Sequence, residues 1–365
     1  MEENKQLKTW RIVAIIATCV AVVLGGLYIS GLSKGKEVEP EETEEPSYLL
    51  QWNDDAKAKV YLEEYMKEIT DENNENFIPV ENRIAVFDLD GTLFCETDPI
   101  YFDHMLFMHR ATEDPNHTAS EFEMEVVEKC QEFIDTGSYP EGLDNLHGQG
   151  VASAFAGMTI SEFYDYVAEY GKTPSPSYNN MNRGDAFYIP MVEVIELLQA
   201  NDFKVYIVSG TDRLIVRGIM NGLSFMHIPA NQIIGSDELI VASHQGDTDG
   251  LDYTYKDDDD LILAGEFIIK NLKLNKVTVI QQEIGMQPVL AFGNSSGDAS
   301  MGKYVTTNNP YKSMAFMLCC DDTVRENGNE KKAQSMYETC EKNGWIAISM
   351  KNDWKTIYGE EVTKK

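Results

Sequence analysis

Residues 83–92 read Arg-Ile-Ala-Val-Phe-Asp-Leu-Asp-Gly-Thr, a short apolar run that ends in two aspartates. A short apolar run of this kind, bounded by polar residues, is typical of a strand buried inside a sheet. Ligands of open α/β sheets bind at the carboxyl ends of the strands. Asp88 and Asp90 therefore stand where a site is expected, and two carboxylates so close together can hold a hard divalent cation. Gly91 permits the tight turn that brings amide N–H groups toward an anion.

The chain beyond this stretch alternates between predicted strands and helices. Further strands are predicted at 204–209, 232–235, 288–292, 314–318 and 345–349, and a β-hairpin at 238–264. Helices are predicted from near Asn53, at 190–200, at 212–221 and at 276–285. Residues 99–172 are helical in pattern, with apolar stripes at 99–111, 120–135 and 160–170. This order predicts an α/β core with a parallel sheet and a helical insertion that forms a lid.

Three more polar segments follow where a phosphate site needs them. Ser209-Gly210-Thr211 ends the second predicted strand and offers a hydroxyl and backbone N–H groups to phosphate oxygens. Lys276 stands at the start of a predicted helix and can place one positive charge on a phosphate. The segment from Gly293 through Asn294 to Asp298 ends the strand at 288–292 and supplies oxygen ligands suited to Mg²⁺.

Together and in this order, the four segments resemble the four motifs of the haloacid dehalogenase superfamily, in its phosphatase branch. The resemblance covers roughly residues 83–349, and the hairpin before the lysine is similar to the phosphoserine-phosphatase-like subgroup. It implies a Rossmann-like parallel sheet core, formed by residues 49–94 and 187–365. It also implies a Mg²⁺-dependent site and an inserted helical cap, here residues 95–186.

The resemblance implies a role for each matching residue. Asp88 would attack phosphorus and form an aspartyl-phosphate, and Asp90 would protonate the leaving group and then deprotonate water. An acid at position 90 is the form found in relatives that act on phosphate esters. Phosphate would be bound by Gly91, Thr92, Ser209, Gly210 and Lys276, and Mg²⁺ by Asp88, Asp90, Asn294 and Asp298.

Two of these assignments have alternatives. The fourth motif begins with Asn294 where an aspartate is commoner in the family, and an amide oxygen brings no charge to the metal. Asp298 would then carry more of the metal binding. Lys270 and Lys273 lie close enough to Lys276 in sequence to take its place.

The residues after the first motif are candidates for substrate recognition. Phe94, Glu96, Tyr101 and Asp103 combine aromatic and acidic groups, which would suit a cationic leaving group such as phosphocholine or a phosphorylated amine. Packing between cap and core is the alternative role for Phe94 and Tyr101.

Composition limits the function further. The 365 residues contain 30 Lys plus Arg and 61 Asp plus Glu, a net charge of −31, and are 43% hydrophobic. This hydrophobic content excludes wholesale disorder. The acidic excess argues against binding to nucleic acid, because little basic surface is left for phosphates.

The N-terminal residues predict a membrane anchor. Residues 12–33 form an uncharged, mostly apolar stretch long enough to cross a bilayer as a helix. Lys5, Lys8 and Arg11 precede it, so residues 1–11 are expected in the cytoplasm and the remainder outside. Residues 34–48 form an acidic linker. A cleaved signal peptide, giving a secreted protein, is the alternative.

These observations lead to one functional prediction. The chain is expected to be a membrane-anchored, extracytoplasmic phosphomonoesterase that uses Mg²⁺ and acts on small phosphorylated substrates. A phosphotransferase on the same fold, or a binding ectodomain without turnover, is the alternative. The oligomeric state does not follow from the sequence.

Overall fold

The computed structural model describes residues 48–365. The predicted cytoplasmic segment, the predicted anchor at 12–33 and nearly all of the predicted linker lie outside the described residues. Among residues 48–365, no helix has both the length and the apolar character to cross a membrane.

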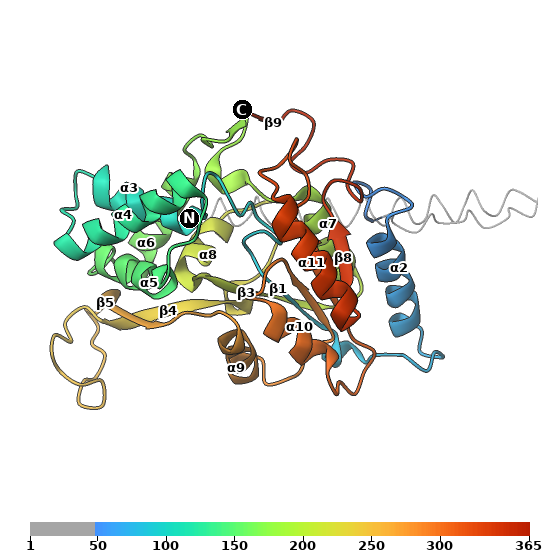
Figure 1. Ribbon diagram of the computed structural model, residues 1–365. Helices are drawn as coiled ribbons and strands as arrows, with labels where there is room; N and C mark the ends of the chain where they lie inside the picture. Colours follow the sequence, from blue (N-terminus) through green and yellow to red (C-terminus); the bar gives the residue numbers. More distant parts are fainter. Residues whose placement is uncertain (1–47) are drawn as a thin grey trace, which may run out of the picture. The chain divides into compact units, whose positions relative to one another are not determined.

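A seven-stranded sheet in the order β5-β4-β3-β1-β6-β7-β8 forms the centre of the described chain (Figure 1). The strands are β1 (Ile84–Phe87), β3 (Lys204–Asp212), β4 (Ile233–Ala242), β5 (Leu261–Ile269), β6 (Leu290–Gly293), β7 (Met314–Cys319) and β8 (Ile346–Ser349). All neighbouring strands pair in parallel except β4 and β5, which form an antiparallel hairpin. The first apolar run is the central strand, and its Phe87 lies beside Ile207 of β3 and Phe292 of β6. This confirms the predicted α/β core.

Helices cover both faces of the sheet, because successive side chains of a strand point to opposite faces. Ala85 and Phe87 of β1 belong to a hydrophobic cluster with α2, α7 and α8, whereas Val86 belongs to a second cluster with α9, α10 and α11. These helices are α2 (Lys57–Thr70), α7 (Ile189–Ala200), α8 (Arg213–Met220), α9 (Leu274–Glu283), α10 (Ala299–Thr306) and α11 (Glu330–Asn343). Short 3₁₀ turns lie at Val80–Asn82, Arg183–Asp185 and Ala230–Gln232.

Four helices form the insertion between β1 and β3, and Figure 1 shows them gathered beside the β4–β5 hairpin. They are α3 (Phe102–Thr112), α4 (Glu121–Thr136), α5 (Leu143–Ala154) and α6 (Ile160–Gly171). Capping boxes at Ser120 and Thr159 begin α4 and α6, since each side chain accepts the N–H of a glutamate three residues on. The apolar stripes predicted α3, α4 and α6.

Helix α5 has no matching apolar stripe, because glycines occupy positions that would otherwise carry apolar side chains. A Cβ at Gly148 would lie 2.5 Å from the Phe267 ring of β5, and one at Gly150 would lie 3.0 Å from the Phe107 ring of α3. The glycines let α5 approach its neighbours closely, an advantage that only the packed structure reveals. Other predictions shift in position: the first described helix begins at Lys57 rather than near Asn53, and the hairpin spans 233–269.

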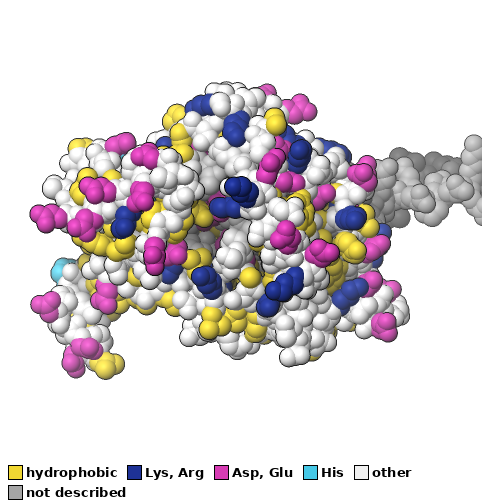
Figure 2. Space-filling view, in the orientation of Figure 1, with side chains coloured by type: hydrophobic (Ala, Val, Ile, Leu, Met, Phe, Trp, Pro, Cys, Tyr) yellow, Lys and Arg dark blue, Asp and Glu magenta, His cyan; other side chains and the backbone are white. Residues whose placement is uncertain are grey.

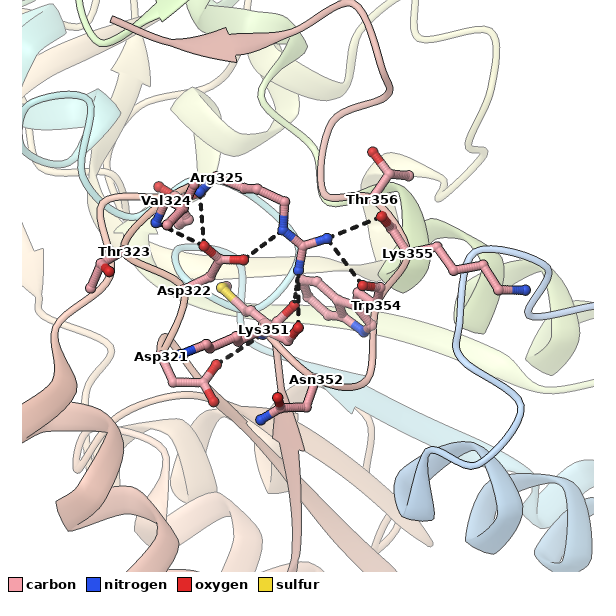
Figure 3. A network of polar contacts seen from close by, with 12 residues as sticks. Asp321, Asp322, Thr323, Val324, Arg325, Lys351, Asn352, Trp354, Lys355 and Thr356 are labelled. Atoms are coloured by element: carbon pink, nitrogen blue, oxygen red, sulfur yellow. Dashed lines mark hydrogen bonds and ion pairs between the residues drawn. The ribbon is translucent and has the colours of Figure 1, made fainter.

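The C-terminal segment is attached to the loop after β7 by Arg325 (Figure 3). The guanidinium donates to the Asp322 carboxylate at 2.6 Å and to four backbone carbonyls, of Met350, Lys351, Trp354 and Lys355. The next residue, Glu326, is buried and accepts the hydroxyls of Tyr178 and Tyr358. Strand β2 (Tyr178–Asn179), which follows α6, pairs with β9 (Thr363–Lys364). These contacts join the end of the insertion to the C-terminal segment.

Charged side chains lie mainly at the surface. Figure 2 shows acidic side chains scattered over one face of the molecule, among fewer Lys and Arg side chains. The buried charged residues are therefore exceptions, and several of them gather at the two places described below.

Candidate active site

A cavity of about 600 Å³ lies at the carboxyl ends of β1, β3 and β6, beside the helical insertion. The motif residues that line it are Asp88, Asp90, Gly210, Lys276, Asn294 and Asp298, joined by Glu96, Tyr101, Asp103, His104 and Tyr139. The four predicted motifs thus reach one cavity, as expected where parallel strands end at one edge of a sheet.

Asp88, Lys276 and Asp298 form a buried charged cluster. Lys276 Nζ lies 2.5 Å from Asp88 Oδ1 and 2.7 Å from Asp298 Oδ1, and the lysine is fully buried. The two carboxylates raise the pKa of Lys276, so the ammonium stays charged. Burial and the Asp298 charge raise the pKa of Asp88 to about 7, against the opposing effect of Lys276.

The structure distinguishes Lys276 from the other candidate lysines. Helix α9 begins two residues before Lys276 and turns its side chain into the cavity. Lys270 and Lys273 also line the cavity, but neither makes an ion pair within the described part of the chain. The positive charge that contacts the expected nucleophile is therefore that of Lys276.

Asp90 is held differently from Asp88. Its Oδ2 accepts the Thr211 hydroxyl at 2.7 Å, and its side chain is buried. Burial and the nearby charges of Asp103 and Asp88 raise the pKa of Asp90 well above its usual value. Asp88 is thus paired with the Lys276 ammonium, whereas the raised pKa of Asp90 favours its protonated form.

The turn after the first motif depends on Gly91. Its φ is +78°, and a Cβ there would lie 1.9 Å from Asn294 Nδ2, so only glycine fits against the fourth motif. Its N–H donates to the Phe94 carbonyl at 2.6 Å and is not free for the predicted phosphate contact. Thr92 is fully buried and does not line the cavity, which also differs from its predicted role.

Ser209 is placed differently from the prediction. It is fully buried, its hydroxyl accepts the Thr211 N–H at 3.0 Å, and it does not line the cavity, whereas Gly210 and Thr211 do. Strand β3 pairs with β1 only as far as Ile207, and its register against β4 shifts between Val208 and Asp212. An irregularity of this kind changes the direction of the side chains within it, and Thr211 supplies the hydroxyl at the cavity.

The donor atoms fit a Mg²⁺ ion. Asn294 Oδ1 is buried without a hydrogen-bond partner among the described residues, and Asn294 lines the cavity with Asp88. Asp298 Oδ2 accepts three hydrogen bonds, from the N–H groups of Asn294 and Ser295 and from the Ser295 hydroxyl. Both oxygens of Asp298 thus accept hydrogen bonds within the protein, so this residue organises the loop and Lys276, and its role as a metal ligand stays a prediction. Asp88, Asn294 and the backbone carbonyl of Asp90 are the oxygen donors that could hold the ion.

The expected substrate residues are divided between cavity and core. Glu96, Tyr101 and Asp103 line the cavity, and the Tyr101 hydroxyl donates to Glu96 at 3.1 Å. Phe94 is buried with ring centroids 4.9 Å from Phe187 and 5.9 Å from Phe102, so it packs in the core and is not a substrate residue.

The sequence analysis missed three cap residues of the cavity, His104, Tyr139 and Asp144. His104 follows Asp103 directly on α3, and its Nδ1 lies 2.7 Å from Asp103 Oδ1. Tyr139 lies in the loop before α5, where no local pattern marks it. A histidine beside an acid at the start of a helix was the only available signal, and it is a common pair.

An α/β sheet with a helical insertion and these four motifs at one edge defines a hydrolase of the haloacid dehalogenase type. A family model described as haloacid dehalogenase-like hydrolase matches residues 85–303, and the chain belongs to this family. A comparison with curated proteins finds no match.

Solved structures with a similar fold include phosphoserine phosphatase and several haloacid dehalogenase-like hydrolases. A functionally unknown protein from Anaerococcus prevotii is 13% identical, with a TM-score of 0.49 over 80% of this chain and 91% of that one. Cytosolic 5′-nucleotidase IIIB bound to cytidine is 12% identical, with a TM-score of 0.44 over 80% and 94%. Substrate-bound phosphoserine phosphatase is 15% identical, with a TM-score of 0.34 over 71% and 97%.

Proposed function

We propose that the chain hydrolyses small phosphate monoesters with Mg²⁺ through a phosphorylated Asp88. The observation that carries this proposal is the contrast between two carboxyls in one cavity. Asp88 contacts the Lys276 ammonium at 2.5 Å, whereas Asp90 contacts the neutral Thr211 hydroxyl at 2.7 Å. A nucleophile and a proton donor need these two different environments.

The first step transfers the phosphoryl group to the protein. A carboxylate oxygen of Asp88 attacks phosphorus, the bond between phosphorus and the ester oxygen breaks, and the Asp90 proton goes to the leaving alkoxide. Lys276 offsets the negative charge that nucleophile and phosphate bring together. Asp88, Asn294 and the Asp90 carbonyl would hold Mg²⁺, which would supply further positive charge to offset that of the nucleophile and the phosphate.

The second step releases the phosphate. Asp90, now a carboxylate, removes a proton from water, the water oxygen attacks phosphorus, and the acyl-phosphate bond to Asp88 breaks. The Thr211 hydroxyl keeps the Asp90 side chain oriented in both steps. Asp88 returns to its carboxylate form, and Asp90 regains its proton.

The residues that line the cavity favour a substrate with a polar or cationic leaving group. Glu96 and Asp103 supply negative charge, and Tyr101 and Tyr139 supply aromatic surface on the cap side. An aromatic face and a carboxylate both favour an ammonium group. We expect faster turnover of phosphocholine or phosphoethanolamine than of neutral sugar phosphates. Faster turnover of the neutral sugar phosphates would contradict a preference for a cationic leaving group.

The test is an assay of the full chain with p-nitrophenyl phosphate, with and without Mg²⁺. We expect Asp88→Asn to lower turnover by roughly 10³-fold or more, because the amide is not a nucleophile. Asp135→Asn, at an exposed acid of α4, is the matched control and should retain activity. Equal turnover of wild type and Asp88→Asn, with both folded, would refute the proposal. Adding alcohol acceptors distinguishes hydrolysis from phosphoryl transfer.

We also propose that residues 12–33 anchor the chain in a membrane with the catalytic residues outside the cytoplasm. The support is the apolar stretch and the basic residues before it. Extraction of membranes at alkaline pH should leave the full chain in the membrane fraction, and recovery of the chain in the soluble fraction would argue against an anchor.

A further inference from the structure

The cap is joined to the core by two chain segments, residues 93–101 and 172–188, which we call the cap connections. They pair with each other where they meet the core. The Cys95 N–H donates to the Ala186 carbonyl, and the Tyr188 N–H donates to the Leu93 carbonyl, each at 2.9 Å. A rotation of the cap away from the cavity must bend the chain at these connections. The contacts that hold them therefore determine how firmly the cap lies over the cavity.

One buried carboxylate contacts both cap connections. Glu326 lies in the loop between β7 and α11 and is 1% exposed. Its Oε1 accepts the hydroxyl of Tyr178, on the second connection, and the thiol of Cys95, on the first, at 3.8 Å. Its Oε2 accepts the hydroxyl of Tyr358, in the C-terminal segment. Glu326 thus binds three parts of the chain that are far apart in the sequence.

Neighbouring side chains bond the same segments. The Asn327 side chain donates to the Thr97 carbonyl at 2.6 Å, so the loop that carries Glu326 also holds the first connection through its backbone. Asp98 Oδ1 accepts the Ser175 hydroxyl and the Ser177 N–H, both at 2.9 Å. The two cap connections are therefore bonded to each other and to one loop of the core.

The C-terminal segment lies along the second connection. Strand β9 pairs with β2, and Lys365 Nζ donates to the Ser175 carbonyl at 2.7 Å. Lys364 Nζ donates to the Glu326 carbonyl at 2.9 Å. Arg325 bonds the same loop to backbone carbonyls within residues 350–355 (Figure 3). The loop, the C-terminal segment and both cap connections thus form one bonded unit.

The contacts of Glu326 oppose an opening of the cap. Burial and the neighbouring Cys95 and Glu326 raise the pKa of both Tyr178 and Tyr358, so their hydroxyls keep the protons that they donate. A movement that carried Tyr178 and Cys95 away from Glu326 would leave a buried carboxylate with fewer donors, which costs free energy. An apolar residue of the same size would lack this directional effect.

We propose that Glu326 is a positioning residue for the reaction, which holds the cap over Asp90 by binding both cap connections and the C-terminal segment. The catalytic part of this inference rests on the proposed function, whereas the position of the cap does not. Glu326 does not line the catalytic cavity, but the cap supplies Tyr101 and Asp103 to it. Glu326 therefore acts through the cap and touches no reacting atom.

A cap that is held less firmly changes the kinetics in a specific way. The apparent dissociation constant of the substrate rises in inverse proportion to the fraction of molecules whose cap is in place. Once the cap has closed over the substrate, the catalytic residues have the same geometry as in the wild type. Loss of the Glu326 contacts is therefore expected to raise KM more than it lowers kcat.

The kinetic test compares Glu326→Gln and Tyr358→Phe with the wild type, using the full chain, p-nitrophenyl phosphate and Mg²⁺. Glutamine keeps the size of the side chain but replaces one acceptor oxygen by an NH₂ group. We expect KM to rise about tenfold in Glu326→Gln and about threefold in Tyr358→Phe, with kcat changing by less than about threefold. Tyr358→Phe removes one donor and keeps the carboxylate, so it carries the test if Glu326→Gln does not fold.

A purely structural role of Glu326 gives a different result. Loss of folded protein lowers the concentration of active enzyme, and hence the apparent kcat, but leaves KM unchanged. An unchanged KM in both variants would therefore overturn the proposal. Glu330→Gln, at an exposed glutamate at the start of α11, is the matched control and should have the wild-type KM.

Amide hydrogen exchange tests the position of the cap without any activity. In Glu326→Gln, exchange at Cys95 and Tyr188 should accelerate at least about tenfold more than exchange at β1 and β6, because the cap connections open while the sheet stays folded. Equal acceleration at the connections and in the sheet, or none at the connections, would overturn the proposal.

The two measurements keep this proposal separate from the phosphatase proposal. If the wild type hydrolyses no phosphate ester, the phosphatase proposal is wrong, and hydrogen exchange still shows whether Glu326 holds the cap. If the wild type is an active phosphatase and both variants keep its KM and its exchange rates, only the positioning role of Glu326 is wrong.

Discussion

The two buried groups of charged residues in this protein are built in opposite ways. At the sheet edge, Lys276 lies between Asp88 and Asp298 at 2.5 and 2.7 Å, so each charge has a partner within the protein. At the junction of cap and sheet, Glu238 and His147 have no partner within residues 48–365. The first group is complete before any ligand arrives, whereas the second is stable only if protons or an ion compensate its charge.

The difference also follows from where the residues come from. The two acids of the sheet-edge group, Asp88 and Asp298, follow the neighbouring parallel strands β1 and β6, which the backbone pairing keeps in fixed register, and Lys276 reaches them from α9. The junction group needs the cap to rest on the hairpin, because α3 and α5 supply one side and β4 the other.

The largest expected effect comes from removing the positive charge of Lys276, which lies between Asp88 and Asp298. Lys276→Met leaves Asp88 and Asp298 as adjacent buried acids with no compensating charge. We expect kcat/KM to fall by about 10²- to 10³-fold and the free energy of unfolding to fall by about 3 kcal/mol. Kinetics with a chromogenic ester and denaturant unfolding measure the two effects.

Lys273→Met is the matched control, because Lys273 lines the same cavity without an ion pair in the described chain. It should change the free energy of unfolding by less than about 1 kcal/mol. If both methionine variants lose the same stability, the charge pairing at Lys276 does not stabilise the fold.

A smaller effect is expected from Gly91→Ala. The added Cβ would meet Asn294 Nδ2 at 1.9 Å, and the φ of +78° is unfavourable for alanine. Asn294 must move, so the Mg²⁺ concentration for half-maximal activity should rise about tenfold. Activity measured over a range of Mg²⁺ concentrations checks this.

Gly137→Ala provides the comparison for backbone strain alone. Gly137 has a φ of +66°, and nothing lies within 4 Å of a Cβ there. It should lose about 1 kcal/mol of stability with no change in the Mg²⁺ requirement. An unchanged Mg²⁺ requirement in Gly91→Ala would mean that Asn294 is not a metal ligand.

The smallest expected effect is the pH dependence of folding stability that the buried, unpaired Glu238 carboxyl causes. In the metal-free protein, burial raises the pKa of Glu238 to about 9, and the unfolded chain has its ordinary value of about 4.3. Between these values the folded state binds more protons than the unfolded state, so stability falls as pH rises from about 4.3 toward 9. Glu238→Gln has no titrating carboxyl at this position, so its stability should not fall with pH in this range and should exceed that of the wild type by a growing margin toward pH 8.

Melting temperatures between pH 5 and pH 9, in the presence of a chelator, measure this difference. Glu266→Gln, at an exposed glutamate on the neighbouring strand β5, should follow the wild-type curve. A wild-type curve that rises with pH at the same rate as that of Glu238→Gln would show that Glu238 is ionised and already compensated in the folded protein.

The residues of the sheet-edge cavity were largely predictable, because most of the motifs follow a local apolar pattern. The run at 84–87 predicts both a central strand and the position of Asp88 and Asp90 at its end. The side-chain directions of Ser209 and Thr92 were not predictable, because they depend on the local backbone at the end of a strand. The pairing of β3 is irregular between Val208 and Asp212, and no residue in its sequence indicates this.

The sequence by itself determined the α/β class, the order of the motifs and their position at the sheet edge, because strand periodicity and the residues that follow a strand are local properties. Only the tertiary structure decided that Lys276 contacts both acids, that Asp298 organises a loop, and that Glu238 and His147 line one small cavity. Glu238 and His147 are 91 positions apart in the sequence. Such pairs arise from the packing of helices against strands, where the free energy depends on distance in space and not on spacing along the chain.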